Sequence, residues 1–195
     1  RGAATAEQSV ATRARRARAQ AHRALMARRA LVLTVSDGVA AGTREDESGA
    51  ALATRLGELG FDVARAVVPD VMEDIATAVN DAAARRVALV ISTGGTGLGP
   101  RDRTPQTLHA LLDYEIAGFG EQMRAFGRTW TPMADLSRSL AGVLGSTLVI
   151  AVPGSMSGAT ESLQAIEPLL DHALETLVGH TQHAASATYE ENEQT

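Results

Sequence analysis

The chain of 195 residues contains neither cysteine nor lysine. Without cysteine it can form no disulfide, thiolate metal site or iron–sulfur cluster, and it has no cysteine nucleophile. All 18 basic residues are arginine, so every mechanism that needs a lysine amine is excluded. No apolar run approaches the roughly 20 residues of a membrane span, and the first residues lack the apolar stretch of a signal peptide. These absences predict a cytoplasmic protein with no membrane partner.

Positive charge is scarce over most of the chain and is concentrated at its start. Residues 1–29 hold 8 arginines and a single acid, Glu7, whereas the rest of the chain holds 10 arginines against 22 acids. Such an acidic body argues against nucleic acid as the main partner. We interpret residues 1–29 as a leader or linker, either ahead of a start at Met26 or joining an upstream domain, in preference to a binding arm.

The hydrophobic pattern from residue 30 onward predicts one domain of alternating strands and helices. Ser48 is the expected N-cap of the first helix, which includes Leu52 and Leu56 and ends at Gly60. The expected strands are 30–36, 61–68, 87–92 and 146–152, and the other expected helices are 71–84, 105–112, 116–126 and 158–178. This order predicts βαβ units in a parallel sheet, a domain at 30–180 and a polar tail at 181–195.

Polar residues follow the predicted strands at points that share one edge of the sheet. Open α/β sheets bind ligands beyond the carboxyl ends of their strands. The residues that follow the strand ends are Ser36 and Asp37, Asp70, the segment 93–103 and the segment 153–157. We therefore predict a single site at this edge.

The strongest local feature is the glycine-rich loop TGGTGLGPRDRTP at 93–105. Its glycines allow positive φ and a close approach of the backbone to a ligand, so that successive amide N–H groups can surround a phosphate. A flexible connector is the alternative, but such a loop seldom lies between a buried strand and a helix start. Thr104 is the expected N-cap of that helix, with Pro105 in its first position.

Three familiar motifs are absent from these segments. A dinucleotide fingerprint that starts at Gly95 needs glycine where Pro100 stands, and a P-loop needs the missing lysine. In the segment GSMSG at 154–158, the third position of a nucleophile elbow is methionine instead of serine. The sequence thus argues against a Rossmann dehydrogenase, a Walker ATPase and a serine hydrolase.

Asp70 and Asp102 each come shortly after a predicted strand. Mg²⁺ is usually held by one or two carboxylates together with substrate phosphates and water, so the pair suits Mg-ATP. Each aspartate alone is equally well explained as a turn or helix-cap residue. The histidines are weaker candidates: His109 and His172 lie on predicted helices and the others near the termini, so a solvated surface is the better interpretation.

These segments resemble the molybdopterin adenylyltransferase family, the Mog and MoaB-like proteins that include the G domain of gephyrin. The matching segments are TVSDG at 34–38, EDESG at 45–49, VVPD at 67–70, STGGTGLGPRDRTP at 92–105, GFGEQMR at 118–124, LSRSLAG at 136–142 and PGS at 153–155. They occur in family order from about residue 30 to residue 180. Together they are very specific, although TGGTG or PGS alone is not.

The resemblance implies a three-layer, doubly wound α/β fold with a mostly parallel sheet. It also implies a homotrimer that binds molybdopterin and ATP and requires Mg²⁺. The implied reaction transfers AMP to the terminal phosphate of the pterin and releases pyrophosphate. The implied partners are other molybdenum-cofactor synthesis enzymes. Asp70 and Asp102 match the two essential aspartates, and they are our candidate catalytic and metal-binding residues. The candidate substrate- and nucleotide-binding residues are Ser36, Asp37, Thr93, Gly94, Gly95, Thr96, Gly97, Arg101, Thr104, Ser137, Gly154 and Ser155.

One departure from the family pattern is Arg103, which replaces a small apolar residue and is expected to meet phosphate instead. Two alternatives to the enzyme remain: a catalytically silent MoaB-like paralogue that binds pterin or nucleotide, and a trimeric scaffold such as gephyrin provides. The carboxylate pair beside a complete phosphate loop favours the enzyme, because a scaffold has no physical need for it.

Overall fold

The computed structural model describes residues 28–179 of the chain. The expected leader, the expected tail at 181–195, and the histidines His22, His180 and His183 lie outside these residues, apart from Arg28 and Arg29 at the end of the leader. Arg29 is the first residue of strand β1, one position before the predicted strand. None of the described helices combines the length and the apolar character that a membrane span needs.

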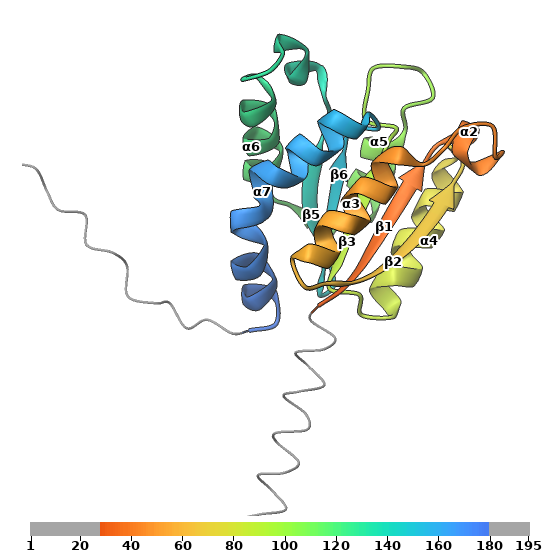
Figure 1. The fold of residues 1–195 in the computed structure, drawn as a ribbon. Coiled ribbons are helices and arrows are strands. Elements are labelled where there is room, and N and C mark those ends of the chain that lie inside the picture. Colours follow the sequence, from red (N-terminus) through yellow and green to blue (C-terminus); the bar gives the residue numbers. More distant parts are fainter. Residues whose placement is uncertain (1–27, 180–195) are drawn as a thin grey trace, which may run out of the picture.

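Within residues 28–179 the chain forms a six-stranded sheet with the order β2-β1-β3-β6-β5-β4 (Figure 1). The strands are β1 Arg29–Val35, β2 Asp62–Val68, β3 Leu89–Thr93, β4 Tyr114–Glu115, β5 Leu140–Leu144 and β6 Thr147–Val152. Strands β2, β1, β3 and β6 are parallel, whereas β5 is antiparallel to β6 and β4 is antiparallel to β5. The mostly parallel α/β sheet that the sequence predicts is therefore confirmed.

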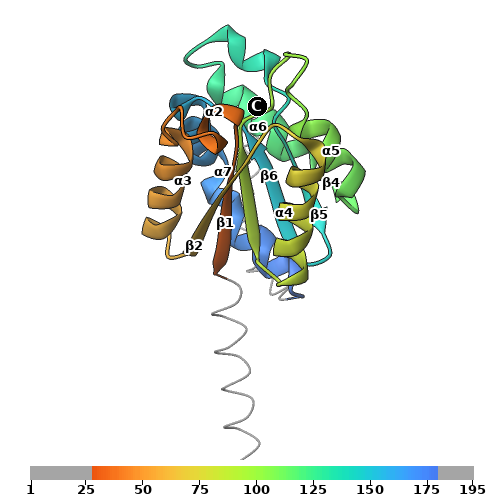
Figure 2. The same cartoon turned by 90° about the vertical axis from the view of Figure 1, so that its right-hand side faces the viewer.

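Helices cover both faces of the sheet and give three layers (Figure 2). The helices are α2 Asp37–Ala40, α3 Glu47–Glu58, α4 Met72–Ala84, α5 Thr104–Leu111, α6 Ala117–Gly127 and α7 Met156–Leu177, with a 3₁₀ helix η1 at Pro132–Leu136. Helices α3, α6 and α7 bury their apolar faces on one side of the sheet. Helices α4 and α5 cover the other side.

The core reflects the periodicities of the sequence. Leu52 and Leu56 are one helical turn apart on α3 and are fully buried, as are Ile75 and Val79 on α4. Each such side chain contributes roughly 1.5–3 kcal/mol when it is removed from water. Strands β3 and β6 are buried on both faces, which explains their continuous apolar runs.

Two predicted helix caps are wrong. The N-cap of α3 is Asp46, whose Oδ1 accepts from the N–H of Gly49 at 3.0 Å, and Ser48 lies inside the first turn. The N-cap position of α5 is Arg103 without a side-chain cap, because the hydroxyl of Thr104 donates to the carbonyl of Gly94 at 3.0 Å. In both cases the predicted cap residue lies inside the helix, and its hydroxyl bonds to another part of the chain: Ser48 to the hydroxyl of Thr93 at 3.2 Å, and Thr104 to the carbonyl of Gly94.

The hairpin of β5 and β6 was not predicted. Gly145 has φ +61° between the two strands, which lets the chain turn within two residues. The antiparallel strand β5 begins at the same edge of the sheet where the parallel strands end. Ser137 and Ser139, just before β5, are thereby brought to the edge where the sequence places the site.

Helices α3 and α7 are held together by a bidentate ion pair. Arg55 donates to the two carboxylate oxygens of Glu167 at 2.6 and 2.8 Å. Hydrogen bonds to Glu167 and then to Glu58 raise the pKa of the Arg55 guanidinium, which stays charged at every working pH. The pair fixes α7 beside α3, and the first turns of both helices reach the site.

Candidate functional site

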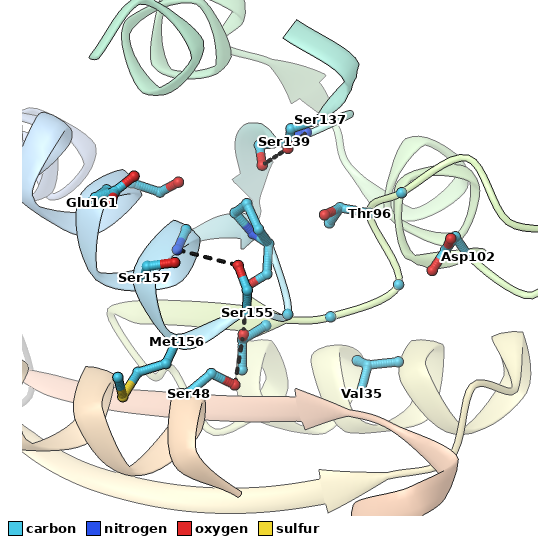
Figure 3. A pocket seen from close by; sticks show the side chains of 18 of the residues that line it. Val35, Ser48, Thr96, Asp102, Ser137, Ser139, Ser155, Met156, Ser157 and Glu161 are labelled. Atoms are coloured by element: carbon cyan, nitrogen blue, oxygen red, sulfur yellow. Dashed lines mark hydrogen bonds between the residues drawn. The ribbon is translucent and has the colours of Figure 1, made fainter. Parts of the chain in front are cut away.

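A cavity of about 1000 Å³ lies at the carboxyl edge of the sheet (Figure 3). It is bounded by the ends of β1, β3 and β6, by the first turns of α3 and α7, and by the segment that joins α6 to β5. One hollow thus lies at the edge of the sheet where the strand ends predict a site. A second, smaller cavity of about 270 Å³ lies behind it, between α5 and the start of β5.

The glycine-rich loop forms one wall of the large cavity. Gly94 has φ +106° and Gly95 has φ +63°, a region that side chains disfavour. A Cβ on Gly94 would overlap the carbonyl oxygen of Val35, and one on Gly95 would overlap the Thr104 hydroxyl. Gly97 does not have a positive φ, but its Cβ would lie 2.9 Å from Oδ2 of Asp102. Two of the four glycines therefore set the turn, and Gly97 makes room for a carboxylate.

The carbonyl oxygens of this loop are turned back to the protein. Those of Gly94 and Gly95 accept from the hydroxyl and the N–H of Thr104 at 3.0 and 3.2 Å. Those of Thr96 and Gly97 accept from the N–H and Nε of Arg138 at 3.0 and 2.8 Å.

Four amide N–H groups of the same loop, those of residues 95–98, form no hydrogen bond within residues 28–179. The amides on either side are occupied, since the N–H of Gly94 donates to the carbonyl of Val152 at 3.2 Å and that of Gly99 donates to Asp102 at 2.7 Å. With its carbonyls occupied and its amides free, the loop presents donors and few acceptors. This is the arrangement that binds phosphate oxygens.

Asp70 and Asp102 both line the cavity, and one carboxylate oxygen of each has no partner within residues 28–179. Oδ2 of Asp70 accepts from the N–H of Asp37 at 2.9 Å, and Oδ2 of Asp102 accepts from the N–H of Gly99 at 2.7 Å. Within the described residues, no group of three or more His, Asp or Glu side chains offers a complete metal cage. Two carboxylates beside the glycine-rich loop nevertheless fit Mg²⁺, which commonly takes its remaining ligands from phosphates and water.

The charged side chains around the cavity are mainly acidic. Six carboxylates line it, those of Glu45, Asp46, Glu47, Asp70, Asp102 and Glu161, against the two arginines Arg44 and Arg124. Asp46 is neutralised by Arg65, which lies outside the cavity wall. An anionic ligand in such a cavity needs a cation as well as the loop amides.

Other predicted residues of the wall follow β1, η1 and β6. Ser36 follows β1 and caps α2, Ser137 follows η1, and Gly154 and Ser155 follow β6. Oγ of Ser137 lies 2.7 Å from Oγ of Ser139, whose carbonyl accepts from Arg124 at 2.9 Å. Ser155 caps the 22-residue helix α7, so the positive end of the helix dipole faces the cavity.

Three of the predicted binding residues lie outside the cavity wall. Asp37 accepts from the N–H of Asp70 at 3.0 Å and forms an ion pair with Arg101. Thr104 is fully buried behind the loop. Arg103, which was expected to meet phosphate, also lies outside, and its Nε donates to the carbonyl of Pro100 at 3.0 Å. These residues support the wall from behind.

The histidines His109 and His172 lie on exposed helix surfaces outside the large cavity, as the sequence predicts. Nδ1 of His109 lies 3.4 Å from a carboxylate oxygen of Glu115.

Sequence reasoning missed several residues of the cavity because they lie within helices or in the segment before β5. Ser48 on α3 and Glu161 and Ser162 on α7 are part of its polar lining. Its exposed apolar residues are Leu98, Trp130, Met133, Leu136 and Met156. The only tryptophan of the chain, next to a Thr-Pro pair, was the available signal for this apolar part.

Comparison with protein families gives one match, to the probable molybdopterin binding domain, over residues 31–172. The matched residues begin in β1 and end in α7, so they include every element that lines the cavity.

Individual relatives agree with this match. The molybdenum cofactor biosynthesis bifunctional protein of Synechococcus elongatus is 43% identical over 77% of the chain, which covers 47% of that protein. The chain thus spans about half the length of the first curated relatives it matches. The molybdopterin adenylyltransferase of Pyrococcus furiosus is 34% identical, with 73% of the chain and 87% of the relative covered.

The crystal structure of the molybdopterin biosynthesis enzyme MoaB from Thermus thermophilus is 45% identical and superposes with a TM-score of 0.73, covering 77% of this chain and 96% of that one. This similarity extends to the three-layer architecture and not only to short motifs. The chain therefore belongs to the family of probable molybdopterin binding domains.

Proposed function

We propose that the protein is a molybdopterin adenylyltransferase, which transfers AMP from Mg-ATP to the terminal phosphate of molybdopterin and releases pyrophosphate. The observation that carries the proposal is the loop at 94–98. The carbonyls of residues 94–97 accept hydrogen bonds from Thr104 and Arg138, while the amides of residues 95–98 have no partner within residues 28–179. It lies in one cavity with the carboxylates of Asp70 and Asp102. Curated relatives with this name cover 73–76% of the chain at 31–34% identity.

The two aspartates are assigned to Mg²⁺. Each offers one free carboxylate oxygen. Because carboxylates outnumber arginines around the cavity, a divalent cation is favoured there. When bound, Mg²⁺ would neutralise phosphate charge and polarise the phosphate that is attacked. Asp37 and Arg101 are assigned a supporting role, because Asp37 holds the backbone of Asp70.

The residues of the chain mainly position the two anions. An oxygen of the pterin phosphate attacks the α-phosphorus of ATP, a new P–O bond forms, and the bond to pyrophosphate breaks. Both reactants bring their own nucleophile and leaving group, so the protein needs to hold them in line and to stabilise charge. The free amides of residues 95–98 and the N-terminal turn of α7, at Gly154 and Ser155, supply fixed donors for that charge. Ser137 and the pair it forms with Ser139 add hydroxyl donors.

The test is to incubate the protein with molybdopterin and Mg-ATP and to measure pyrophosphate and adenylylated pterin. Equal amounts of both products are expected, and chelation of Mg²⁺ should stop their formation. Pterin binding without pyrophosphate would identify the silent paralogue, and no binding of either substrate would favour a scaffold. The proposal includes the homotrimer and the cytoplasmic location, which light scattering and cell fractionation test.

A further inference from the structure

Three buried or half-buried polar side chains that line the cavity have no hydrogen-bond partner within the described part of the chain. They are Thr96 in the glycine-rich loop and the neighbours Glu161 and Ser162 in the second turn of α7. Thr96 is only 3% exposed and Ser162 only 6%. Among the described residues, every side-chain N or O atom that is fully shielded from solvent has a hydrogen-bond partner. The hydroxyls of Thr96 and Ser162 have none, so they must still be accessible from the cavity. Polar groups in a buried wall without a protein partner call for an explanation, and a ligand in the cavity would supply the missing hydrogen bonds.

Glu161 gives the cavity wall a negative charge at the second turn of α7, away from the glycine-rich loop that is proposed to bind phosphate. Figure 3 shows Glu161 and Asp102 on opposite sides, with Thr96 near Asp102. The half-buried carboxylate of Glu161 has no ion-pair partner among residues 28–179. It would repel a phosphate, so the part of the ligand that reaches α7 has to carry hydrogen-bond donors.

We infer that Glu161, with Ser162 beside it, recognises the guanidine-like edge of the pterin ring. This inference rests on the proposed function for the identity of the ligand. An ionised carboxylate only accepts hydrogen bonds, and its two oxygens match two adjacent N–H donors. The pterin edge offers such a pair, the exocyclic amino group and the neighbouring ring N–H. On every edge of adenine the amino group lies beside an acceptor nitrogen, which a carboxylate repels. Glu161 thus selects pterin over adenine and sets which substrate lies along α7.

The experiment compares wild-type protein with Glu161→Gln in binding to two ring systems. The probes are hydroxymethylpterin phosphate and hydroxymethyl-lumazine phosphate, in which a carbonyl replaces the exocyclic amino group. The substituted amide turns a donor towards the pterin donors, so pterin affinity should fall by roughly ten- to a hundredfold. Lumazine affinity should change much less, and ATP affinity should stay at the wild-type value. Glu175→Gln is the matched control, because Glu175 lies on the same helix but is exposed and outside the cavity.

Ser162→Ala adds a second measurement that does not alter charge, and it should weaken pterin binding by a smaller factor in the same direction. The inference is overturned if Glu161→Gln binds the pterin phosphate like wild type, even when wild type transfers AMP normally. A selective loss of ATP affinity would overturn it too, because adenine would then occupy this end. Failure of the wild-type protein to bind any pterin phosphate would reject the proposed function and the inference with it.

Discussion

Asp37 and Asp70 hold each other by reciprocal hydrogen bonds across the ends of β1 and β2. The N–H of Asp37 donates to Oδ2 of Asp70 at 2.9 Å, and the N–H of Asp70 donates to Oδ1 of Asp37 at 3.0 Å. The remaining oxygen of Asp37 pairs with Arg101, whereas the remaining oxygen of Asp70 is free. Only Asp70 lines the cavity. The two residues therefore have different roles. Asp37 fixes the backbone of Asp70, and Asp70 presents a negative charge to the cavity.

Substitution of the two aspartates should separate these roles. Asp70→Asn keeps an acceptor for the N–H of Asp37, so stability should change little while AMP transfer falls by about a hundredfold or more through the lost charge. Asp37→Ala leaves the N–H of Asp70 unpaired and should cost about 1–2 kcal/mol of unfolding free energy. Urea denaturation and pyrophosphate release measure the two effects. Equal loss of stability in both variants would contradict the separation.

For Asp102 we expect AMP transfer to be lost while pterin binding survives. The carboxylate is assigned to metal-bound ATP, and it also accepts from the N–H of Gly99 at 2.7 Å. Asp102→Asn retains an acceptor for this N–H and removes the charge, whereas Asp102→Ala removes both. Both variants should lose transfer by about a hundredfold or more. Titration with hydroxymethylpterin phosphate checks binding, and an equal loss of binding and transfer would argue against a role in holding metal-bound ATP.

Much of the fold could be predicted from the sequence because hydrophobic periodicity decides it. The parallel strands β1, β2, β3 and β6 and the five longer helices lie within about two residues of their expected positions. Strand β5 was missed, since its five residues contain Gly142 and its pairing depends on the turn at Gly145. The two helix caps were wrong because the hydroxyls of Ser48 and Thr104 bond to Thr93 and Gly94. Such choices depend on contacts that are distant in the sequence.

The site was predictable where it follows strand ends and unpredictable where it lies inside helices. Asp70, Thr96 and Ser155 lie two or three residues after the ends of β2, β3 and β6, and a topological rule places them at one edge. Glu161 and Ser162 lie in the second turn of α7, and whether they face the cavity depends on how the helix is rotated against the sheet. Nothing in the local sequence specifies that rotation. Arg103 is the opposite example, a residue that the sequence placed at the ligand and the structure does not. Its side chain is next to the glycine-rich loop but donates to the carbonyl of Pro100 and lies outside the cavity.

Arg138 is expected to act as a positioning residue for the phosphate loop. Its Nε and Nη2 donate to the carbonyls of Gly97 and Asp102 at 2.8 and 2.6 Å. Arg138→Met removes both bonds and should cost about 1–3 kcal/mol. Because the loop amides and Asp102 then lose their alignment, kcat should fall more than KM rises. Arg138→Lys can satisfy one carbonyl and should recover part of kcat.

The matched control for Arg138 is Arg128→Met, which removes an exposed ion pair with Asp135. It should leave both kinetic constants near wild type, since exposed pairs contribute little. If Arg138→Met lowered the melting temperature and left kcat unchanged, Arg138 would be a structural residue only.

Removal of residues from the start of the chain should have no effect up to Met26 and a clear effect beyond it. Arg28 donates to the carbonyl of Leu59 at 3.0 Å, lies 3.5 Å from Asp171 and lies 5.6 Å above the ring of Phe61. Its carbonyl also accepts from Asp62, at the start of β2. A chain that begins at Met26 keeps these contacts and should fold and react like the full chain.

A chain that begins at Ala30 loses the contacts of Arg28 and should lose about 1–3 kcal/mol of stability. Thermal unfolding of the two shortened chains gives the comparison. A large loss of stability or turnover in the chain from Met26 would show that residues before it contribute to the domain.

Two glycines of the same loop should respond differently to substitution. Gly94 has φ +106°, and a Cβ there would overlap the carbonyl oxygen of Val35, which belongs to the neighbouring strand β1. Neither backbone can move without disturbing the sheet, so Gly94→Ala should cost about 1–3 kcal/mol or more and lower the melting temperature. Gly97 has no positive φ, and its Cβ would meet the Asp102 carboxylate at 2.9 Å, a group that can shift. Gly97→Val should therefore leave the circular-dichroism spectrum and the melting temperature near wild type. It should nevertheless weaken binding of ATP and pterin by about one to two decades, because the displaced carboxylate and the added side chain reach the free amides. Wild-type affinity for both substrates in Gly97→Val would show that the loop is a connector only, and the phosphate site would then have to lie elsewhere in the cavity.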